Sequence, residues 1–570
     1  MIPFDNSVNQ PPAVSSDLES PLASLAAAAL RHAARSPRER AELAAATARS
    51  VAATTDAWAE IAAAIKSRPR AAATGQGMEP PPAGGTPESL AEELATGPLA
   101  TVRLLKLTAS ALQRIDHDEL PWSGPLRIVH PTTGDERTSR VEVPVLPAPG
   151  LFDGTIFGGF SAAVRCGNPG GLDRFRAVWR EEVRSRPAGG GVAVVLGAGN
   201  VTGLAAADAI CQVFEHGRAA YVKLHPLHEP LAATLARALS PLVESGMIAI
   251  AVGGPDVAAR AITSPLVTHV HLTGGTAAFE AIAASCSKPI SCELGSVTPW
   301  IIVPGEYSPR ELAYQADMVA GSIINNASFN CIATKLVVTS RSWRQREAFL
   351  DRIRLRLGQT PPRPAWFPGS ASGWETLAER PAPADGTLPW LFRTGLDREA
   401  ERHWLDREWF LPACAEIAIQ ADSMEQFCVN TSSLAGSLPG SLAASVTMPG
   451  RGDVRDLRRA EALIEHLAFG VVAVNCWSAI AYAMGAVPWG GFPGATRAAP
   501  KSGIGFVHDP LLLPLVQNSI IRGPLVSRLM PPFLPWHPRA AALSREVVRL
   551  YDGGGLLSIA RMLPNLRVAR

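Results

Sequence analysis

Residues 192–203 join a short apolar run to a glycine-rich turn, Val-Ala-Val-Val-Leu-Gly-Ala-Gly-Asn-Val-Thr-Gly. The first part, Val192 to Leu196, is typical of a buried strand, and the Ala-rich residues 203–216 predict a helix. Such a turn at the start of a helix presents free N–H groups and the positive end of the helix dipole, which suit a pyrophosphate. Glycine is also needed where a strand packs tightly against its helix, so nucleotide binding and simple packing both stay open.

The residues after this turn repeat the alternation of strand and helix. Short β-branched runs at 220–224, 247–252 and 267–272 are separated by Ala- and Leu-rich stretches. This alternation predicts a parallel, doubly wound sheet with helices on its faces. The expected fold class is therefore α/β.

The flanking segments predict further elements. Residues 21–66 and 89–114 carry Ala, Leu and Ile at helical spacing, so we expect a helical N-terminal region. Residues 126–145 contain two alternating runs around a Thr-Thr-Gly-Asp turn, which predict a β-hairpin that could serve subunit contacts. The Pro- and Gly-rich segments 75–87 and 361–389 are predicted to be a linker and a long irregular segment.

Length and composition restrict the class of protein. A chain of 570 residues is expected to form two or three domains. The formal net charge is only +2 and there is no long run of Lys or Arg, so nucleic acid is not an expected partner. No apolar stretch reaches the roughly 20 residues that span a bilayer, and no secretory signal is visible at the N-terminus. We therefore expect a soluble, cytoplasmic protein that acts on small molecules.

The eight cysteines are scattered, without a CxxC pair or a nearby histidine cluster. This spacing argues against a structural metal or a disulfide framework and favours a reducing compartment. Cys331 nevertheless ends an amide-rich run that starts at Asn325, and Glu293 stands upstream in Cys-Glu-Leu-Gly. A thiol and a carboxylate are the two groups needed for covalent aldehyde chemistry, although a lone cysteine is also commonly a buried small apolar residue.

Several other motifs occur in a fixed order between residues 190 and 510. Asn200 follows the first strand, and Lys223 ends the second strand, where an ordinary dinucleotide fold has an acidic residue. The later motifs are Thr273-Gly274-Gly275-Thr276, Glu293-Leu294-Gly295 with Pro299, Asn326 to Cys331, Glu408-Trp409-Phe410-Leu411-Pro412, Phe469 to Asn475, Pro488-Trp489-Gly490-Gly491 and Ser502-Gly503-Ile504-Gly505. In this order, the motifs resemble those of the aldehyde dehydrogenase superfamily.

The resemblance implies a fold, a domain division and an assembly. The implied fold has a Rossmann-like cofactor domain, an α/β catalytic domain and a small oligomerisation element. Homodimers or homotetramers are the implied assemblies. The corresponding ranges are 1–125 for the helical N-terminal region, 126–292 for the cofactor-binding domain with the hairpin, 293–490 for the catalytic domain and 491–570 for the C-terminal extension.

The resemblance also implies site roles for oxidation of an aldehyde to a carboxylic acid with NAD or NADP. Cys331 would be the nucleophile and Glu293 the general base, while the Asn200 amide and the Cys331 backbone N–H would form the oxyanion hole. The residues implied to hold the cofactor are Lys223 at the adenosine ribose, Gly274 and Gly275 close to the cofactor, and Glu408 and Phe410 at the nicotinamide half.

Departures from the family pattern keep alternatives open. Ser296 and Val297 follow the Glu-Leu-Gly motif in place of Gly and Lys, and Ser328 and Phe329 replace Gly and Gln. A catalytically silent nucleotide-binding scaffold is therefore a rival hypothesis. A coenzyme A-acylating dehydrogenase is another, although Glu293 favours hydrolysis of the thioester.

The substrate and the choice of cofactor also stay open. Pro226 stands where the family often has Glu, which leaves NADP plausible beside NAD. The aromatic residues Phe329, Trp409 and Trp477 suggest a hydrophobic aldehyde, although core packing explains them equally well. The apolar, Pro-rich residues 510–535 could cover an interface, an access channel or a membrane surface, or could simply pack on the protein.

Overall fold

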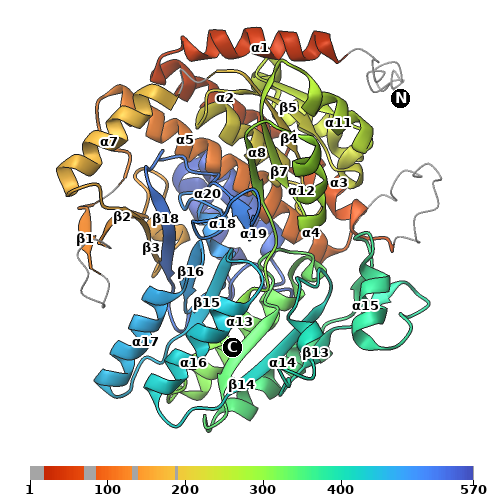
Figure 1. Ribbon diagram of the computed structural model, residues 1–570, viewed down its shortest axis with the longest axis vertical. Coiled ribbons are helices and arrows are strands. Elements are labelled where there is room, and N and C mark those ends of the chain that lie inside the picture. The colour runs from red at the N-terminus through yellow and green to blue at the C-terminus, as the bar shows by residue number, and fades with distance from the viewer. Residues whose placement is uncertain (1–17, 70–84, 123, 131–138, 187–189, 569–570) are drawn as a thin grey trace.

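The computed structural model describes residues 18–69, 85–122, 124–130, 139–186 and 190–568. Within these residues, the strands form one ten-stranded, one six-stranded and one two-stranded sheet. Figure 1 shows the six-stranded sheet in the upper half of the molecule, beneath the N-terminal helices, and the larger sheet in the lower half. The α/β fold expected from the sequence is confirmed.

The six-stranded sheet contains the strands predicted around the glycine-rich turn. All five residues of β4 are buried, as expected for a parallel strand covered on both faces. Only the contact between β17 and β8 is antiparallel among the described strands of this sheet. The spatial order is β17 (Gly503–Ile504), β8 (Ile290–Glu293), β7 (Val267–Thr273), β4 (Val192–Leu196), β5 (Ala219–Lys223) and β6 (Ile248–Ala251). The helices between these strands are α8 (Leu204–Phe214), α9 (Ala232–Ala238), α10 (Ser240–Glu244), α11 (Pro255–Thr263) and α12 (Thr276–Ser285).

The ten-stranded sheet is parallel from β13 to β18 and antiparallel from β18 to β1. The spatial order is β1 (Arg127–Val129), β2 (Arg140–Leu146), β3 (Ser161–Gly167), β18 (Val516–Arg522), β16 (Val471–Val474), β15 (Ala443–Thr447), β9 (Pro299–Ile302), β10 (Leu336–Ser340), β14 (Ala413–Ile419) and β13 (Leu391–Arg393). The helices that occur along the chain between or after these strands include α6 (Asp153–Ile156), α7 (Leu172–Ser185), α13 (Pro309–Ile324), α14 (Arg346–Gln359), α16 (Met424–Ser437), α17 (Val454–His466) and α18 (Ile480–Met484).

The predicted hairpin is confirmed by the antiparallel pairing of β1 with β2, although its turn lies outside the described residues. The sequence analysis grouped these strands with the cofactor domain. In the structure they join the larger sheet, because β3 pairs with β18, which is distant in sequence.

The prediction of a long irregular segment at 361–389 was wrong. This segment contains α15 (Ser370–Ala378) and a pair of short strands, β11 (Arg363–Pro364) and β12 (Thr387–Leu388). Trp366 and Trp374 are each only 1% exposed and belong to an apolar cluster. Burial of two large indole rings stabilises regular structure here despite the many Pro and Gly residues.

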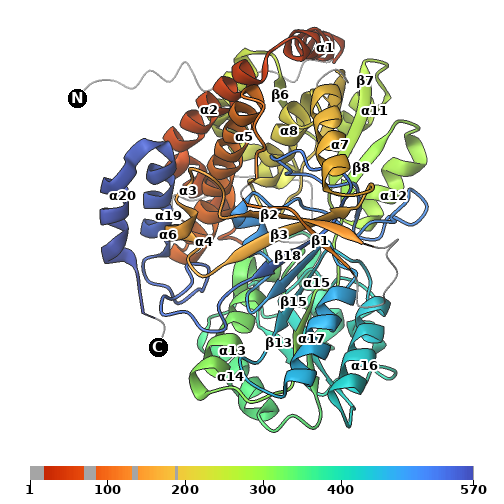
Figure 2. The same cartoon turned by 90° about the vertical axis from the view of Figure 1, so that its left-hand side faces the viewer.

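The predicted N-terminal helices are confirmed, while most of the predicted linker at 75–87 lies outside the described residues. The helices are α1 (Glu19–Ala33), α2 (Pro37–Ala53), α3 (Thr55–Ile65), α4 (Pro87–Leu94) and α5 (Ala100–Asp116), with a π-helical turn at Ala95–Leu99. Figure 2 shows them beside the C-terminal helices α19 (Ala540–Arg549) and α20 (Gly555–Met562). None of the helices in the described ranges is both long enough and apolar enough to cross a bilayer.

A buried ion pair ties this N-terminal region to the rest of the chain. Arg103 on α5 is 1% exposed and donates to both carboxylate oxygens of Asp153, at 2.7 and 3.1 Å. It also donates to the hydroxyl of Tyr551 and to the carbonyl of Met484. One side chain therefore joins elements from three distant parts of the sequence.

We expect Arg103→Ala to lower the free energy of unfolding by about 3–5 kcal/mol, because it leaves the Asp153 carboxylate buried without its cation. The urea midpoint of the purified protein measures this loss. Arg38→Ala is the control, because its pair with Glu42 is exposed and contributes less than about 1 kcal/mol. Equal midpoints for the two variants would contradict the prediction.

Candidate active site

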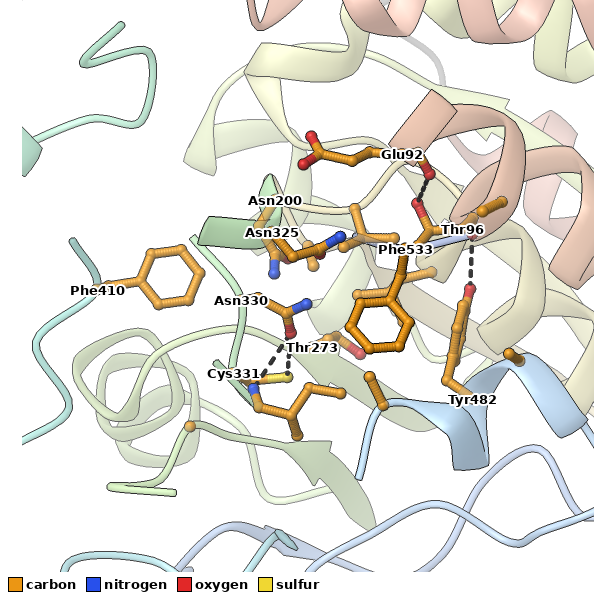
Figure 3. Close-up of a pocket in the computed structure, with 18 of the residues that line it drawn as sticks. Glu92, Thr96, Asn200, Thr273, Asn325, Asn330, Cys331, Phe410, Tyr482 and Phe533 are labelled. Atoms are coloured by element: carbon orange, nitrogen blue, oxygen red, sulfur yellow. Dashed lines mark hydrogen bonds between the residues drawn. The ribbon is translucent and has the colours of Figure 1, made fainter. Parts of the chain in front are cut away.

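A cavity of about 760 Å³ lies where the carboxyl ends of β4, β7 and β8 face the turn that carries Cys331. Figure 3 shows Asn200, Asn330, Cys331, Phe410 and Phe533 around this space. Seven of the eight predicted site residues line it, namely Cys331, Glu293, Asn200, Gly274, Gly275, Glu408 and Phe410.

Cys331 is partly exposed to the cavity, and its thiol is held in the protonated form. Its Sγ lies 3.9 Å from Oδ1 of Asn330, which also accepts a hydrogen bond from the backbone N–H of Ile332. Burial raises the pKa of Cys331, and the nearby carboxyl groups of Glu408 and Glu293 raise it further. Nucleophilic attack therefore needs an additional positive charge or a proton acceptor beside the sulfur.

Glu293 ends β8 and lines the cavity, and the residue is 6% exposed. Among the described residues, neither carboxyl oxygen has a hydrogen-bond partner. Burial raises the pKa of Glu293 well above its usual range, and the charge of Asp208 adds to this shift. A buried, unpartnered carboxyl group that faces a cavity is suited to exchange a proton with a ligand or water there.

Asn200 lies in the glycine-rich turn, next to the turn that leads to Cys331. Its Nδ2 donates to the carbonyl of Phe329 at 3.2 Å. An amide nitrogen carries two N–H bonds, and the second has no partner within the described part of the chain. Asn200 can therefore donate one hydrogen bond to an oxygen bound in the cavity.

The second glycine turn forms a cradle for an anionic group. Gly275 is the N-cap of α12, whose first turn has no side-chain cap, and both Gly275 and Thr276 line the cavity. No atom lies within 4 Å of the place that a Cβ on Gly275 would occupy. Uncapped N–H groups at a helix start, next to open space, fit a pyrophosphate.

Lys223 is the predicted site residue that does not line the cavity. Its carbonyl accepts a hydrogen bond from the N–H of Gly197 at 3.1 Å, so the end of β5 lies against the glycine-rich turn. Burial lowers the pKa of the Lys223 side chain. His225, two residues later, does line the cavity, with its ring against Gly199. Contact of Lys223 with a ribose stays a prediction.

Glu408 reaches into the turn that follows Glu293. A Cβ on Gly295 would stand 1.6 Å from Oε2 of Glu408, so only glycine leaves room for this carboxyl group. Burial raises the pKa of Glu408 to about 7, opposed by the charge of Lys335 and by the backbone N–H of Ser296. The sequence motif around Gly295 therefore makes space for a second acidic group beside the thiol.

Lys335 is a functional candidate that the sequence analysis missed. It is 5% exposed and donates to the carbonyl and hydroxyl of Ser328 and to the carbonyl of Leu411, at 2.9–3.0 Å. Burial lowers the pKa of Lys335 to about 8, and its charge opposes the upward shift of the Cys331 pKa. The sequence did offer one signal for Lys335, since it stands directly before the apolar strand β10. A charged residue next to a strand that is buried on both faces is uncommon, so it indicates a specific role.

Two other groups of residues line the cavity, and the first overlaps the Pro-rich segment 510–535, for which an access channel was one of the expected roles. Residues 532–538 of the C-terminal segment line the cavity with Cys331, as do Asp208 and His508, which are joined by a 2.9 Å hydrogen bond. Of the aromatic residues named from the sequence, Trp477 lines the cavity, whereas Phe329 and Trp409 do not. Phe329 is fully buried and packs on Trp366, so core packing explains it.

Comparison with known proteins agrees with this arrangement. Residues 176–363 match the family model described as the aldehyde dehydrogenase family. No curated protein matches the chain in sequence. Among solved structures, the chain is similar to an NAD-dependent aldehyde dehydrogenase from Sinorhizobium meliloti, with 15% identity, a TM-score of 0.55 and coverage of 90% of this chain and 87% of that chain.

Two further structures have the same fold. The aldehyde dehydrogenase KauB from Pseudomonas aeruginosa is 14% identical, with a TM-score of 0.58 and 88% of each chain covered. A Mycobacterium tuberculosis aldehyde dehydrogenase, solved with NAD+, is 15% identical, with the same TM-score and coverage. Residues 176–363 therefore match the aldehyde dehydrogenase family model, and the chain as a whole has the fold of these solved aldehyde dehydrogenases.

Proposed function

We propose that the protein is an NAD(P)-dependent aldehyde dehydrogenase that oxidises an aldehyde to the carboxylic acid through Cys331. The observation that carries this proposal is that Cys331, Glu293 and Asn200 line one cavity with the glycine cradle at Gly275. A nucleophile, a proton acceptor, an oxyanion donor and an anion site are thus available to one substrate.

The reaction begins when Glu293 accepts the thiol proton of Cys331, directly or through a water, and the sulfur attacks the carbonyl carbon to give a thiohemiacetal alkoxide. The free N–H of the Asn200 amide and the backbone N–H of Cys331 donate to the developing alkoxide. Loss of hydride from this carbon leaves a thioester on Cys331. After Glu293 has released that proton to solvent, it accepts a proton from water as the water oxygen attacks the thioester carbon. The C–S bond then breaks, the carboxylic acid leaves, and the Cys331 sulfur takes up the proton from Glu293 to give the thiol again.

The cofactor fits the half of the cavity that lies beside α12. The α12 N-terminus and Gly274 would hold the pyrophosphate, Glu408 and Phe410 would hold the nicotinamide half, and Lys223 is proposed for the adenosine ribose. When bound, the nicotinamide ring supplies the hydride acceptor and a positive charge that favours the thiolate. The proposal covers both NAD and NADP, because no carboxylate at position 226 repels a 2′-phosphate.

The substrate half of the cavity has an apolar wall that favours a hydrophobic aldehyde. Trp477 and Phe533 both line the cavity, with their ring centroids 5.1 Å apart. Leu534 packs closely on Gly321, where an added Cβ would stand 2.4 Å from it. The C-terminal segment is thus held against the core, and we propose that it contacts the aldehyde side chain.

The proposed chemistry predicts an asymmetry between two variants. Cys331→Ala should abolish aldehyde oxidation, because no thiohemiacetal can form. Glu293→Gln should slow the acid-forming step by about 100-fold and leave a burst of reduced cofactor. Stopped-flow absorbance with NAD or NADP and a panel of aldehydes measures both effects.

Parallel reactions with coenzyme A separate the acylating rival, which would oxidise aldehydes only when the thiol acceptor is supplied. Binding of cofactor without any aldehyde oxidation would favour the silent scaffold. Retention of most activity by Cys331→Ala would contradict the proposal.

The pKa of Glu293 predicts the pH dependence of acid formation. Its raised pKa means that the carboxyl group is neutral and cannot accept a proton at low pH, and becomes an effective base as pH rises. We therefore expect kcat to keep rising with pH above the range in which an ordinary glutamate titrates, by up to about tenfold per pH unit. Glu293→Gln should flatten this rise in the acid-forming step, and an unchanged pH profile would contradict the assignment.

The apolar wall predicts a change in substrate preference. Phe533→Ala should lower kcat/KM for an aromatic or long-chain aldehyde by about 10–100-fold, because up to about 3 kcal/mol of apolar contact is lost. The kcat/KM for acetaldehyde, which is too small to reach this wall, should fall much less. The matched control is Phe160→Ala, a partly buried aromatic outside the cavity, and equal losses for both aldehydes would rule out a role in specificity.

A further inference from the structure

The turn that leads to Cys331 has an unusual backbone conformation. Asn326, Ala327 and Ser328 have φ values of 53°, 53° and 65°. Three consecutive non-glycine residues in the left-handed region are costly, and such conformations persist only where surrounding contacts enforce them. The position of Cys331 therefore depends on the groups that hold this turn.

The side chain and backbone of Asn326 receive these contacts. Nζ of Lys66, the C-cap residue of α3, donates to Oδ1 of Asn326 at 2.6 Å. Nδ2 of Asn326 donates to the carbonyls of Asn200 at 3.0 Å and Phe329 at 2.8 Å. Its backbone N–H donates to Oε1 of Glu92 at 3.0 Å. All of these partners are buried.

The charges around this turn are paired, one pair within the N-terminal region and one between it and β11. Lys66 is 1% exposed and forms an ion pair with Glu93, which is fully buried. Arg363 pairs with Glu92 at 3.0 Å, and the Lys66 ammonium lies 4.9 Å from the centre of the Trp366 ring. Burying four charges, two of each sign, costs much desolvation free energy. We therefore expect these residues to have a structural role that offsets this cost.

We propose that Lys66 is a positioning residue for Cys331, which acts by fixing the Asn326 amide and with it the left-handed turn. The inference rests on the proposed role of Cys331 as the nucleophile. Without the ammonium, the Asn326 amide loses the contact that orients it toward the carbonyls of Asn200 and Phe329. The turn can then relax, and the thiol moves relative to the Asn200 amide that serves the oxyanion.

The first test compares Lys66→Met with Lys106→Met, a partly buried lysine on the neighbouring helix α5. Lys66→Met should lower kcat by about 10–100-fold while KM for the cofactor changes less than about threefold, because misplacement of the thiol affects chemistry and leaves the cofactor half intact. Lys106→Met should match the wild type. A wild-type kcat for Lys66→Met overturns the inference.

A second readout does not depend on dehydrogenase activity. The rate of Cys331 alkylation by iodoacetamide, followed by peptide mass spectrometry, should change by about fivefold or more in Lys66→Met. If alkylation changes but no variant or wild type oxidises any aldehyde, the positioning role stands and the proposed function fails. Unchanged alkylation overturns the positioning role.

Relief of backbone strain gives the sharpest test. Ala327→Gly, added to Lys66→Met, should restore kcat and the alkylation rate at least about threefold toward wild type, because glycine adopts positive φ without cost. Loss of stability alone predicts no such rescue.

If Lys66→Met does not fold, Lys66→Arg is measured in its place. Its effect should be intermediate, since a guanidinium keeps the ion pair with Glu93 but not the single ammonium contact with Asn326. Wild-type values for Lys66→Arg in that case overturn the inference.

Discussion

The side-chain amide of Asn326 connects the three parts of the protein that meet at the cavity. It donates to the backbone of the glycine-rich turn at Asn200 and of the nucleophile turn at Phe329, and accepts from Lys66 in the N-terminal helices. One amide group is thus hydrogen-bonded both to the turn that carries Asn200, the proposed oxyanion donor, and to the turn that leads to Cys331. The buried charges that surround it are costly to desolvate, but each is paired, and the pairs specify one arrangement of the turn.

Burial controls the chemistry of the site as well as its geometry. The pKa values of Cys331, Glu293 and Glu408 are all raised, so two acidic groups and a thiol share a small volume without strong mutual repulsion. Burial therefore disfavours the thiolate form of Cys331. A cationic group bound in the cavity would stabilise the thiolate, which links catalysis to occupation of the cofactor half.

Local sequence patterns correctly predicted the strand and the glycine-rich turns that line the α12 side of the cavity. The strand at Val192–Leu196 and the two glycine turns could be predicted because periodicity and helix starts are local properties. Membership of the hairpin in the larger sheet could not, because it depends on β18, which is far along the chain. The same reason explains why Lys66 and Lys335 were not identified from the sequence. Each gains its role from a long-range contact, and neither lies in a motif that marks it.

The central claim is that Cys331 carries the acyl group during turnover. Acid-quenched reactions of the full-length protein with NAD or NADP and a hydrophobic aldehyde, digested and analysed by mass spectrometry, test this directly. The account predicts that the peptide containing Cys331 gains the mass of the acyl group, most strongly in Glu293→Gln. Formation of the acid with no adduct on Cys331, or with the adduct on another cysteine, would contradict it.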